Sequence, residues 1–234
     1  MDYIISILAG AIAILFVLCP HEFAHAYIAY KNGDPTAKIY GRMTLNPVKH
    51  LDPFGFVLFA LVGFGWARPV PINPDNFRRR RVGMFTTAIA GVCVNLLIAF
   101  IAYPLYLVAF RYLAPYSLTS NVADFFVALL LSVLSGIYIY SLYSFVFNLL
   151  PLFPLDGFRV VESFTREINP VRRFLQKYSR VILIVLIALS FLIDRVSGRL
   201  PILQYFDVFN YIGWFAREII GFPIKAAWGW ILTV

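Results

Sequence analysis

The chain has 234 residues, of which 61% are hydrophobic and only 14% are charged. Soluble domains usually have about 45–50% apolar and about 25% charged residues, so this composition excludes a disordered chain, a collagen and an ordinary water-soluble enzyme. It indicates a polytopic membrane protein. The net charge is +8. Because the basic residues cluster between apolar runs, we assign them to loop topology and anionic lipid, and we expect no nucleic-acid partner.

Long apolar runs predict the spanning helices. A bilayer core about 30 Å thick requires about 20 apolar residues per helix. Residues 4–30, 84–110 and 122–147 meet this length, whereas residues 181–193 are a shorter candidate and residues 202–232 are apolar but interrupted by charges and a proline. We therefore expect an all-α polytopic membrane protein with about five (four to six) transmembrane helices.

Between the first two long runs, residues 54–66 are apolar but too short to span a bilayer. Gly55, Gly63 and Gly65 interrupt them, which favours a short re-entrant β-hairpin after the first helix. Such a hairpin, continuing into residues 67–72, could offer an edge to an extended peptide by strand addition. We expect residues 1–234 to form a single membrane-embedded domain, with a core at 1–165 and additional C-terminal helices at 178–234.

The distribution of basic residues predicts the orientation. Residues 31–81 contain nine Lys and Arg, including the run Arg78–Arg81, and residues 157–180 contain six. The connection at residues 111–121 contains one. Because cytoplasmic loops are enriched in Lys and Arg, the two basic segments are predicted to be cytoplasmic and the N-terminus to lie outside.

The first apolar run contains the motif His21-Glu22-Phe23-Ala24-His25, or HExxH. On a helix, residues four apart share one face, so both imidazoles can bind one zinc ion at about 2.0–2.1 Å per nitrogen. Glu22 lies close enough to act as general base on a water bound to that metal. Ionisable side chains inside a membrane helix are functional candidates by default. The distance from Tyr3 to His21 is about 27 Å of helix, which places the motif toward the cytoplasmic side.

A catalytic zinc usually has three protein ligands, so two histidines leave one position to fill. Asp156 is a candidate, because it follows the third long run at its predicted cytoplasmic end. It is equally consistent with an N-cap of the following helix. His50 is the other histidine of the chain. It is either a surface or loop-packing residue, which we favour, or a group that lines the site and competes with Asp156 for zinc.

Together, HEFAH on the first helix and NLLPLFPLDG at residues 148–157 resemble the site-2 protease family of intramembrane zinc metalloproteases. The segments GDPTAKIYGRMTLNPVKHLDPFGF and GWARPVPINPDNF resemble the compact prokaryotic type without a PDZ domain. The resemblance covers roughly residues 10 to 165. It implies His21, His25 and Asp156 as zinc ligands, and Glu22 as the catalytic base. One departure is the segment at residues 90–95, AGVCVN, which lacks the proline of the AGPxxN-like pattern of the family.

Two amide side chains within or next to the long runs are candidates for binding a substrate backbone or the oxyanion. A peptide that unwinds in lipid exposes unpaired backbone groups, and the enzyme must supply hydrogen-bond partners for them. Asn148 and Asn95 are the candidates. Each is also consistent with a buried hydrogen bond between helices.

The resemblance thus implies an intramembrane zinc endopeptidase with one Zn²⁺ per chain, which cleaves peptide bonds in or near transmembrane segments of membrane-protein substrates. A water on the zinc, activated by Glu22, would be the nucleophile. The expected location is the cell membrane, with the lipid bilayer and a transmembrane substrate as partners and the active site toward the cytoplasm. The alternatives are a membrane zinc transporter and a non-catalytic scaffold. The scarcity of ligands in the outer half argues against transport, and the intact Glu22 argues against a scaffold.

Overall fold

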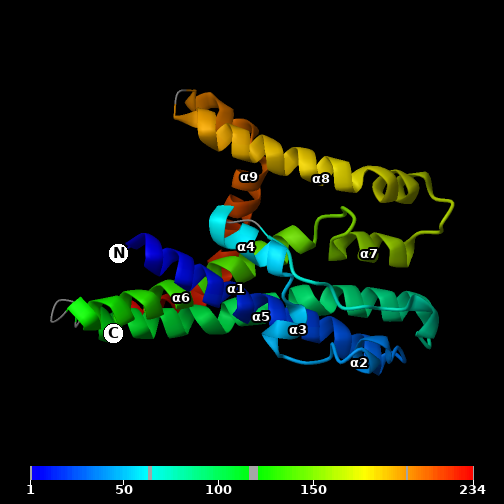
Figure 1. The fold of residues 1–234 in the computed structure, drawn as a ribbon, viewed down its shortest axis with the longest axis horizontal. Coiled ribbons are helices and arrows are strands. Elements are labelled where there is room, and N and C mark those ends of the chain that lie inside the picture. Colours follow the sequence, from blue (N-terminus) through cyan, green and yellow to red (C-terminus); the bar gives the residue numbers. More distant parts are fainter. Residues whose placement is uncertain (1, 63–64, 116–120, 199, 234) are drawn as a thin grey trace.

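The computed structural model describes residues 2–62, 65–115, 121–198 and 200–233. Within these ranges the regular elements are helical, and the one pairing of extended chain is an isolated antiparallel bridge between Leu51 and Ala67. Figure 1 shows a long helical bundle with a further long helix lying apart from it. In chain order the elements are α1 Asp2–Lys31, α2 Thr36–Ile39, α3 Pro47–His50, α4 Pro53–Val62, η1 Pro74–Asn76, α5 Arg80–Leu113, α6 Asn121–Asn148, α7 Asp156–Phe164, α8 Pro170–Ser197, η3 Pro201–Phe206, α9 Val208–Trp214, η4 Phe215–Ile220, α10 Gly221–Trp228 and η5 Gly229–Leu232.

Helices α1, α5 and α6 form the bundle, and each packs against the other two. Among the described residues, they are the three helices long and apolar enough to cross a membrane, over Tyr3–Lys31, Arg80–Leu113 and Val122–Asn148. The predictions for the three long apolar runs are therefore confirmed. The bundle is the frame that places the candidate site, since α1 and α5 carry parts of it and α6 leads into the rest.

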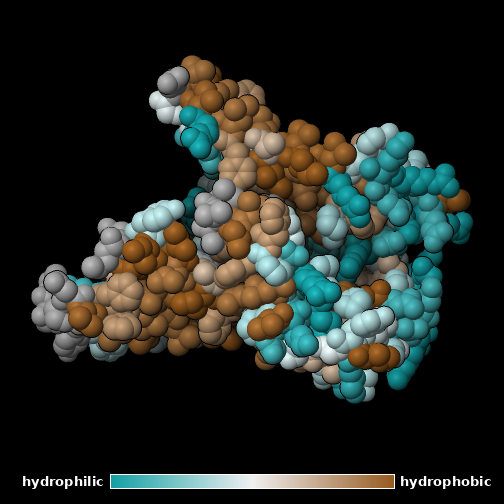
Figure 2. Space-filling model, in the orientation of Figure 1, coloured by the Kyte–Doolittle hydropathy of each residue, from teal (hydrophilic) through white to brown (hydrophobic). Residues whose placement is uncertain are grey.

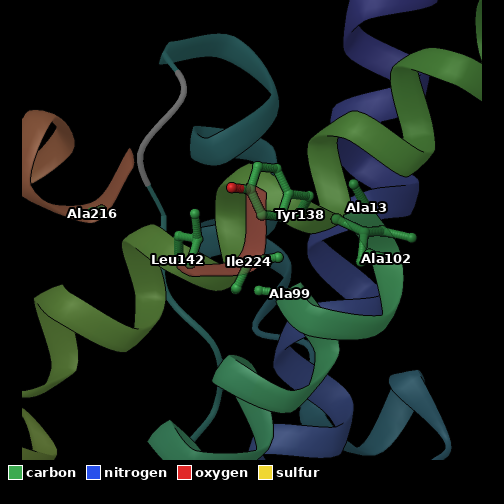
Figure 3. Packing of buried hydrophobic residues seen from close by; sticks show 8 residues of the cluster. Ala13, Ala99, Ala102, Tyr138, Leu142, Ala216 and Ile224 are labelled. Carbon is green, nitrogen blue, oxygen red and sulfur yellow. The ribbon is translucent and has the colours of Figure 1, made fainter. Parts of the chain in front are cut away.

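Small side chains let these helices approach closely. Ala13 of α1 and Ala99 and Ala102 of α5 lie in one buried cluster with Tyr138 and Leu142 of α6. Figure 3 shows that the C-terminal segment also reaches this cluster. In lipid, apolar burial gives little drive for helix association, so close backbone approach at small residues is the expected source of stability.

The predicted β-hairpin is wrong, because residues 53–62 form helix α4. Asp52 accepts a hydrogen bond from Gly55 N at 2.9 Å, and Pro53 occupies the first helical position, so this start has the signals of a helix N-terminus. Gly55 and Gly65 allow two parts of the backbone to approach closely. A Cβ on Gly55 would lie 2.3 Å from Trp66 O, and one on Gly65 would lie 2.1 Å from Gly55 O.

The expected number of about five spanning helices is not supported either. Residues 181–193 are helical within α8, yet α8 is not among the candidate spans of the described chain. Residues 202–232 form a series of short helices, of which α9, η4 and α10 return to the bundle and pack on α5 and α6. In α8, the charged residues Asp194 and Arg195 directly follow the apolar residues 181–193. The apolar stretch at residues 202–232 is interrupted by the charged residues Asp207, Arg217 and Glu218.

The surface divides along the long axis of the molecule. Figure 2 shows apolar residues over the part of the bundle away from α2, and hydrophilic residues over the opposite end, around α2, α7 and the start of α8. This division is what a bundle embedded in a bilayer, with one polar end in water, requires.

Candidate metal centre

Helix α1 presents the HExxH side chains on its inner face. His21, Glu22 and His25 are 5%, 8% and 2% exposed. Their four-residue spacing brings the two imidazole centroids to 4.5 Å, with the rings nearly perpendicular at 84°. The Nε2 atoms of the two histidines lie 2.9 Å apart. His21 is ten residues before the end of α1 at Lys31, about 15 Å along the axis.

The turn between α6 and α7 carries Asp156 to these imidazoles. Asp156 Oδ2 lies 3.2 Å from His21 Nε2 and 3.1 Å from His25 Nε2. Gly157 lets the turn close, because a Cβ there would lie 2.3 Å from Leu149 O. Asp156 is the first residue of α7, but the N-cap is Leu155 and no side chain caps this helix. The capping alternative for Asp156 is therefore wrong.

The three facing atoms have the spacing that a tetrahedral zinc ion needs. Their separations are 2.9, 3.1 and 3.2 Å. Tetrahedral ligands at about 2.0–2.1 Å from zinc lie about 3.3 Å from one another, so a small outward shift suffices. His21, His25 and Asp156 are the one group of this kind within the described part of the chain.

The chemistry of the donor set also fits a cation. His25 Nδ1 donates a hydrogen bond to Thr87 O at 2.7 Å, so in the neutral ring the lone pair of Nε2 faces the Asp156 carboxylate. A carboxylate oxygen and the nitrogen lone pairs of two imidazoles are ligand types that zinc takes, so this donor set suits a zinc ion.

Helix α5 forms the wall behind the two histidines. Thr87, Gly91 and Asn95 follow one another at intervals of four residues and are all buried, so they share one face. A Cβ on Gly91 would lie 2.4 Å from His25 Nε2 and 2.6 Å from His21 Cε1. Thr87 and Gly91 were not predicted from the sequence. Their spacing puts them on the same helix face as Asn95, but only the packing of α5 on α1 shows that this face meets the histidines.

Residues 67–72 have no regular secondary structure beyond the bridge at Ala67, and two of them precede prolines, which favours extended backbone. We name them the cover segment. Val70 N donates to Glu22 Oε2 at 2.9 Å, and the Val70 side chain is buried beside Ala26 and Ala37. This hydrogen bond fixes one carboxylate oxygen of Glu22, and no hydrogen bond within the described residues holds the other, so the predicted base is oriented while one of its oxygens stays available.

Side chains and backbone on both flanks hold the cover segment. Arg68 N donates to His50 O at 2.8 Å, and Arg42 Nη2 donates to Arg68 O at 2.5 Å. Just beyond the segment, Asn73 N donates to Asp34 Oδ2 at 2.7 Å. The segment therefore depends on the loop between α1 and α4 for its place over Glu22.

The remaining candidates lie around the site in different ways. Asn95 is fully buried, with Nδ2 at 3.0 Å from His21 Nδ1 and 2.7 Å from Ser144 Oγ. Asn148 is half-buried, and its Nδ2 donates to Ser144 Oγ at 3.0 Å. Their predicted contacts with substrate or oxyanion stay predictions. His50 is 1% exposed, lies outside the metal-binding group and donates from Nε2 to Thr44 O at 2.6 Å, as the loop-packing interpretation predicts.

The profile of Peptidase family M50 matches residues 9–193 of this chain. The chain belongs to peptidase family M50. This match contains most of the first helix with the HExxH motif, the cover segment and Asp156, and it confirms the resemblance to the site-2 proteases.

Among curated relatives, a Bacillus subtilis (strain 168) protein named "Putative zinc metalloprotease YwhC" is 46% identical over 144 residues, which are 61% of this chain and 63% of the relative. A Mycolicibacterium smegmatis protein named "Putative zinc metalloprotease Rip2" is 27% identical over 161 residues, 67% of this chain and 56% of the relative. The chain thus covers less than two thirds of the length of either relative. No solved structure gives a significant match.

Proposed function

We propose that this chain is an intramembrane zinc endopeptidase that cleaves peptide bonds in or near transmembrane segments of membrane proteins. The observation that carries the proposal is the convergence of His21 Nε2, His25 Nε2 and Asp156 Oδ2 beside the buried Glu22 carboxylate. Membership of family M50 and the names of the relatives support it. His21, His25 and Asp156 would hold the ion. When bound, zinc supplies Lewis acidity, which makes a water molecule more acidic and polarises the scissile carbonyl.

Glu22 supplies the proton transfers. Its carboxylate accepts a proton from the attacking water, whose oxygen forms the new bond to the scissile carbonyl carbon, and delivers that proton to the leaving amine nitrogen as the C–N bond breaks. Val70 N–H holds Glu22 Oε2, so the carboxylate enters this step already oriented. Asn148 is the candidate donor to the carbonyl oxygen, because it is partly exposed and lies eight residues before Asp156.

The substrate class follows from the position of the site. The ligands belong to a bundle whose three long helices are apolar enough to cross a membrane. A substrate helix must unwind before water reaches its peptide bond, and extended chain near the base suits a peptide in that form. The basic residues of 31–81 and 157–180 favour a site toward the cytoplasm, with the N-terminus outside.

The test is co-expression with candidate single-span membrane proteins, followed by cleavage assays of the purified pair in proteoliposomes. We expect cleavage by the wild type, none by Glu22→Gln with zinc still bound, and normal cleavage by the matched control Glu167→Gln, whose side chain is exposed. Cleavage that persists in Glu22→Gln would refute the assigned base. Zinc flux without any peptide cleavage would favour transport, and zinc binding with neither activity would favour a scaffold.

A further inference from the structure

One side chain beside the metal-binding group has an unusual hydrogen-bond pattern. Asn95 is fully buried, and its Nδ2 faces both His21 Nδ1 and Ser144 Oγ. Its Oδ1 is also buried and has no hydrogen-bond partner. Because Oδ1 gives up no hydrogen bond when it moves, the carboxamide can exchange its two ends if there is a reason for Nδ2 to leave His21.

The reason follows from the tautomer that a metal selects. The proposed zinc site uses Nε2 of His21, which faces His25 and Asp156. A neutral imidazole that gives its Nε2 lone pair to a metal carries its proton on Nδ1, so Nδ1 becomes a donor. The Asn95 amide NH₂ would then face another donor. The two ends of a carboxamide have nearly the same shape, so rotation by about 180° brings Oδ1 to this place without repacking.

We infer that Asn95 is a positioning residue for His21, and that its Oδ1 accepts the hydrogen bond from His21 Nδ1–H when the proposed zinc site is loaded. The same rotation brings Oδ1 to Ser144, whose hydroxyl donates to it while accepting from Asn148 Nδ2. The network runs from Asn148 through Ser144 and Asn95 to the imidazole, and each step joins a donor to an acceptor. This inference rests on the proposed function, because it requires the metal.

The arrangement of α5 gives each histidine its own acceptor. His25 Nδ1 donates to Thr87 O, and the rotated Asn95 serves His21 in the same way. His21 faces Asn95, and His25, four residues later on α1, faces Thr87, eight residues earlier on α5. The two helices therefore run antiparallel, and the two pairs lie side by side. Both imidazoles are then fixed in the tautomer that directs Nε2 toward Asp156.

Two substitutions separate positioning from packing. Asn95→Leu keeps the approximate volume and removes both polar ends, whereas Asn95→Asp keeps an acceptor oxygen toward His21. We expect Asn95→Leu to bind zinc about 10–100-fold more weakly, as loss of a hydrogen-bond partner to a metal-binding histidine commonly does, and Asn95→Asp to bind nearly as tightly as the wild type. A packing role predicts the opposite order, because Leu suits an apolar interface and a buried carboxylate does not.

The measurement is the zinc dissociation constant of the detergent-solubilised chain, by competition with a chelator. A second readout is the ¹⁵N spectrum of histidine-labelled protein, since the chain has three histidines. We expect the His21 Nδ1–H signal to be protected from solvent exchange in the wild type and in Asn95→Asp, and exchange-broadened in Asn95→Leu.

The outcomes are distinct. Equal zinc affinity of the wild type and Asn95→Leu, or weaker binding by Asn95→Asp than by Asn95→Leu, overturns the inference and leaves the proposed function intact. Absence of zinc binding by the wild type defeats the proposed function itself. If Asn95→Leu does not fold, Asn95→Asp decides alone: near wild-type affinity supports the inference, and a loss of tenfold or more, about 1.4 kcal/mol, overturns it.

Discussion

Val70 N donates a hydrogen bond to Glu22 Oε2 at 2.9 Å, across 48 residues of sequence. The donor belongs to an extended segment, and the acceptor belongs to a membrane helix. Both residues are buried, so little solvent competes for this bond. A buried hydrogen bond to a charged group contributes about 1.5–3 kcal/mol, enough to set the direction of the carboxylate.

We therefore expect Val70→Pro, which removes the N–H, to lower kcat about tenfold to a hundredfold while zinc stays bound. Pro69 and Pro71 already flank this position, so extended backbone there accepts a further proline. The measurement is the initial rate of cleavage beside zinc content. Val70→Ala is the matched control, because it keeps the N–H and loses only the packing on Ala26 and Ala37. If the alanine variant loses as much activity as the proline variant, the N–H has no special part.

Gly91 is the point at which α5 approaches the two histidines. A Cβ at this position would lie 2.4 Å from His25 Nε2, and real Cβ atoms do not approach this closely. Gly91→Ala must displace the imidazole or the helix, so we expect zinc affinity to fall at least about tenfold and cleavage with it. Gly198→Ala is the control, because a Cβ there meets nothing within 4 Å. Zinc content and thermal unfolding should be measured together. Unchanged zinc affinity in Gly91→Ala would contradict the observed packing.

His50 and Asp156 give opposite expectations for metal binding. Asp156 Oδ2 is within 3.2 Å of both imidazole Nε2 atoms, whereas His50 binds Thr44 O in the loop. We expect His50→Ala to keep about one zinc per chain and Asp156→Ala to lose most of it, since three protein ligands are the norm for a catalytic zinc. Metal analysis of dialysed protein measures both. Loss of zinc in His50→Ala but not in Asp156→Ala would mean that His50, and not Asp156, is the third zinc ligand.

The sequence predicted the metal-binding group because its signals are local. HExxH needs only the helical period to bring His21 and His25 together. Asp156 was harder, because a carboxylate before a helix is also a candidate capping residue, and only the structure shows that Leu155 is the N-cap and Asp156 the first residue of α7. The three long helices followed from apolar length alone.

Other features depend on contacts that no local pattern encodes. The wall formed by Thr87 and Gly91 is visible only once α1 lies against α5. Residues 54–66 were assigned to a hairpin on their glycines, although Asp52-Pro53 is a helix start and Gly55 is needed for the close approach of Trp66. The predicted number of spanning helices was too high where charged residues lie within or beside an apolar stretch. Such a stretch is long enough to span a bilayer only if its charged residues are included.

Asp34 holds the loop after α1 against the chain beyond the cover segment. Its carboxylate is fully buried and accepts hydrogen bonds from Asn73 N at 2.7 Å, Thr36 N at 3.0 Å and Asn76 Nδ2 at 2.9 Å, and also from the Thr36 hydroxyl. Burial raises the pKa of this carboxyl, but the hydrogen bonds outweigh burial and lower it below its ordinary value of 3.8. The charged form is thus the one that the fold stabilises.

The pKa of the Asp34 carboxyl is lower in the folded chain than in the unfolded chain. The ionised carboxylate therefore contributes its full stability above the unfolded pKa, and this stability is lost as the pH falls through the unfolded pKa toward the folded pKa. We expect Asp34→Asn to lower the free energy of unfolding by about 1.5–3 kcal/mol at pH 7, because Nδ2 would face the Asn73 N–H donor. The difference from the wild type should shrink below about pH 4. Unfolding in detergent, followed by circular dichroism from pH 3 to 7, measures it. Asp75→Asn is the matched control, since its ion pair with Arg80 is exposed and contributes little. A difference between Asp34→Asn and the wild type that stays constant across this pH range would mean that the buried charge has no part in holding the loop.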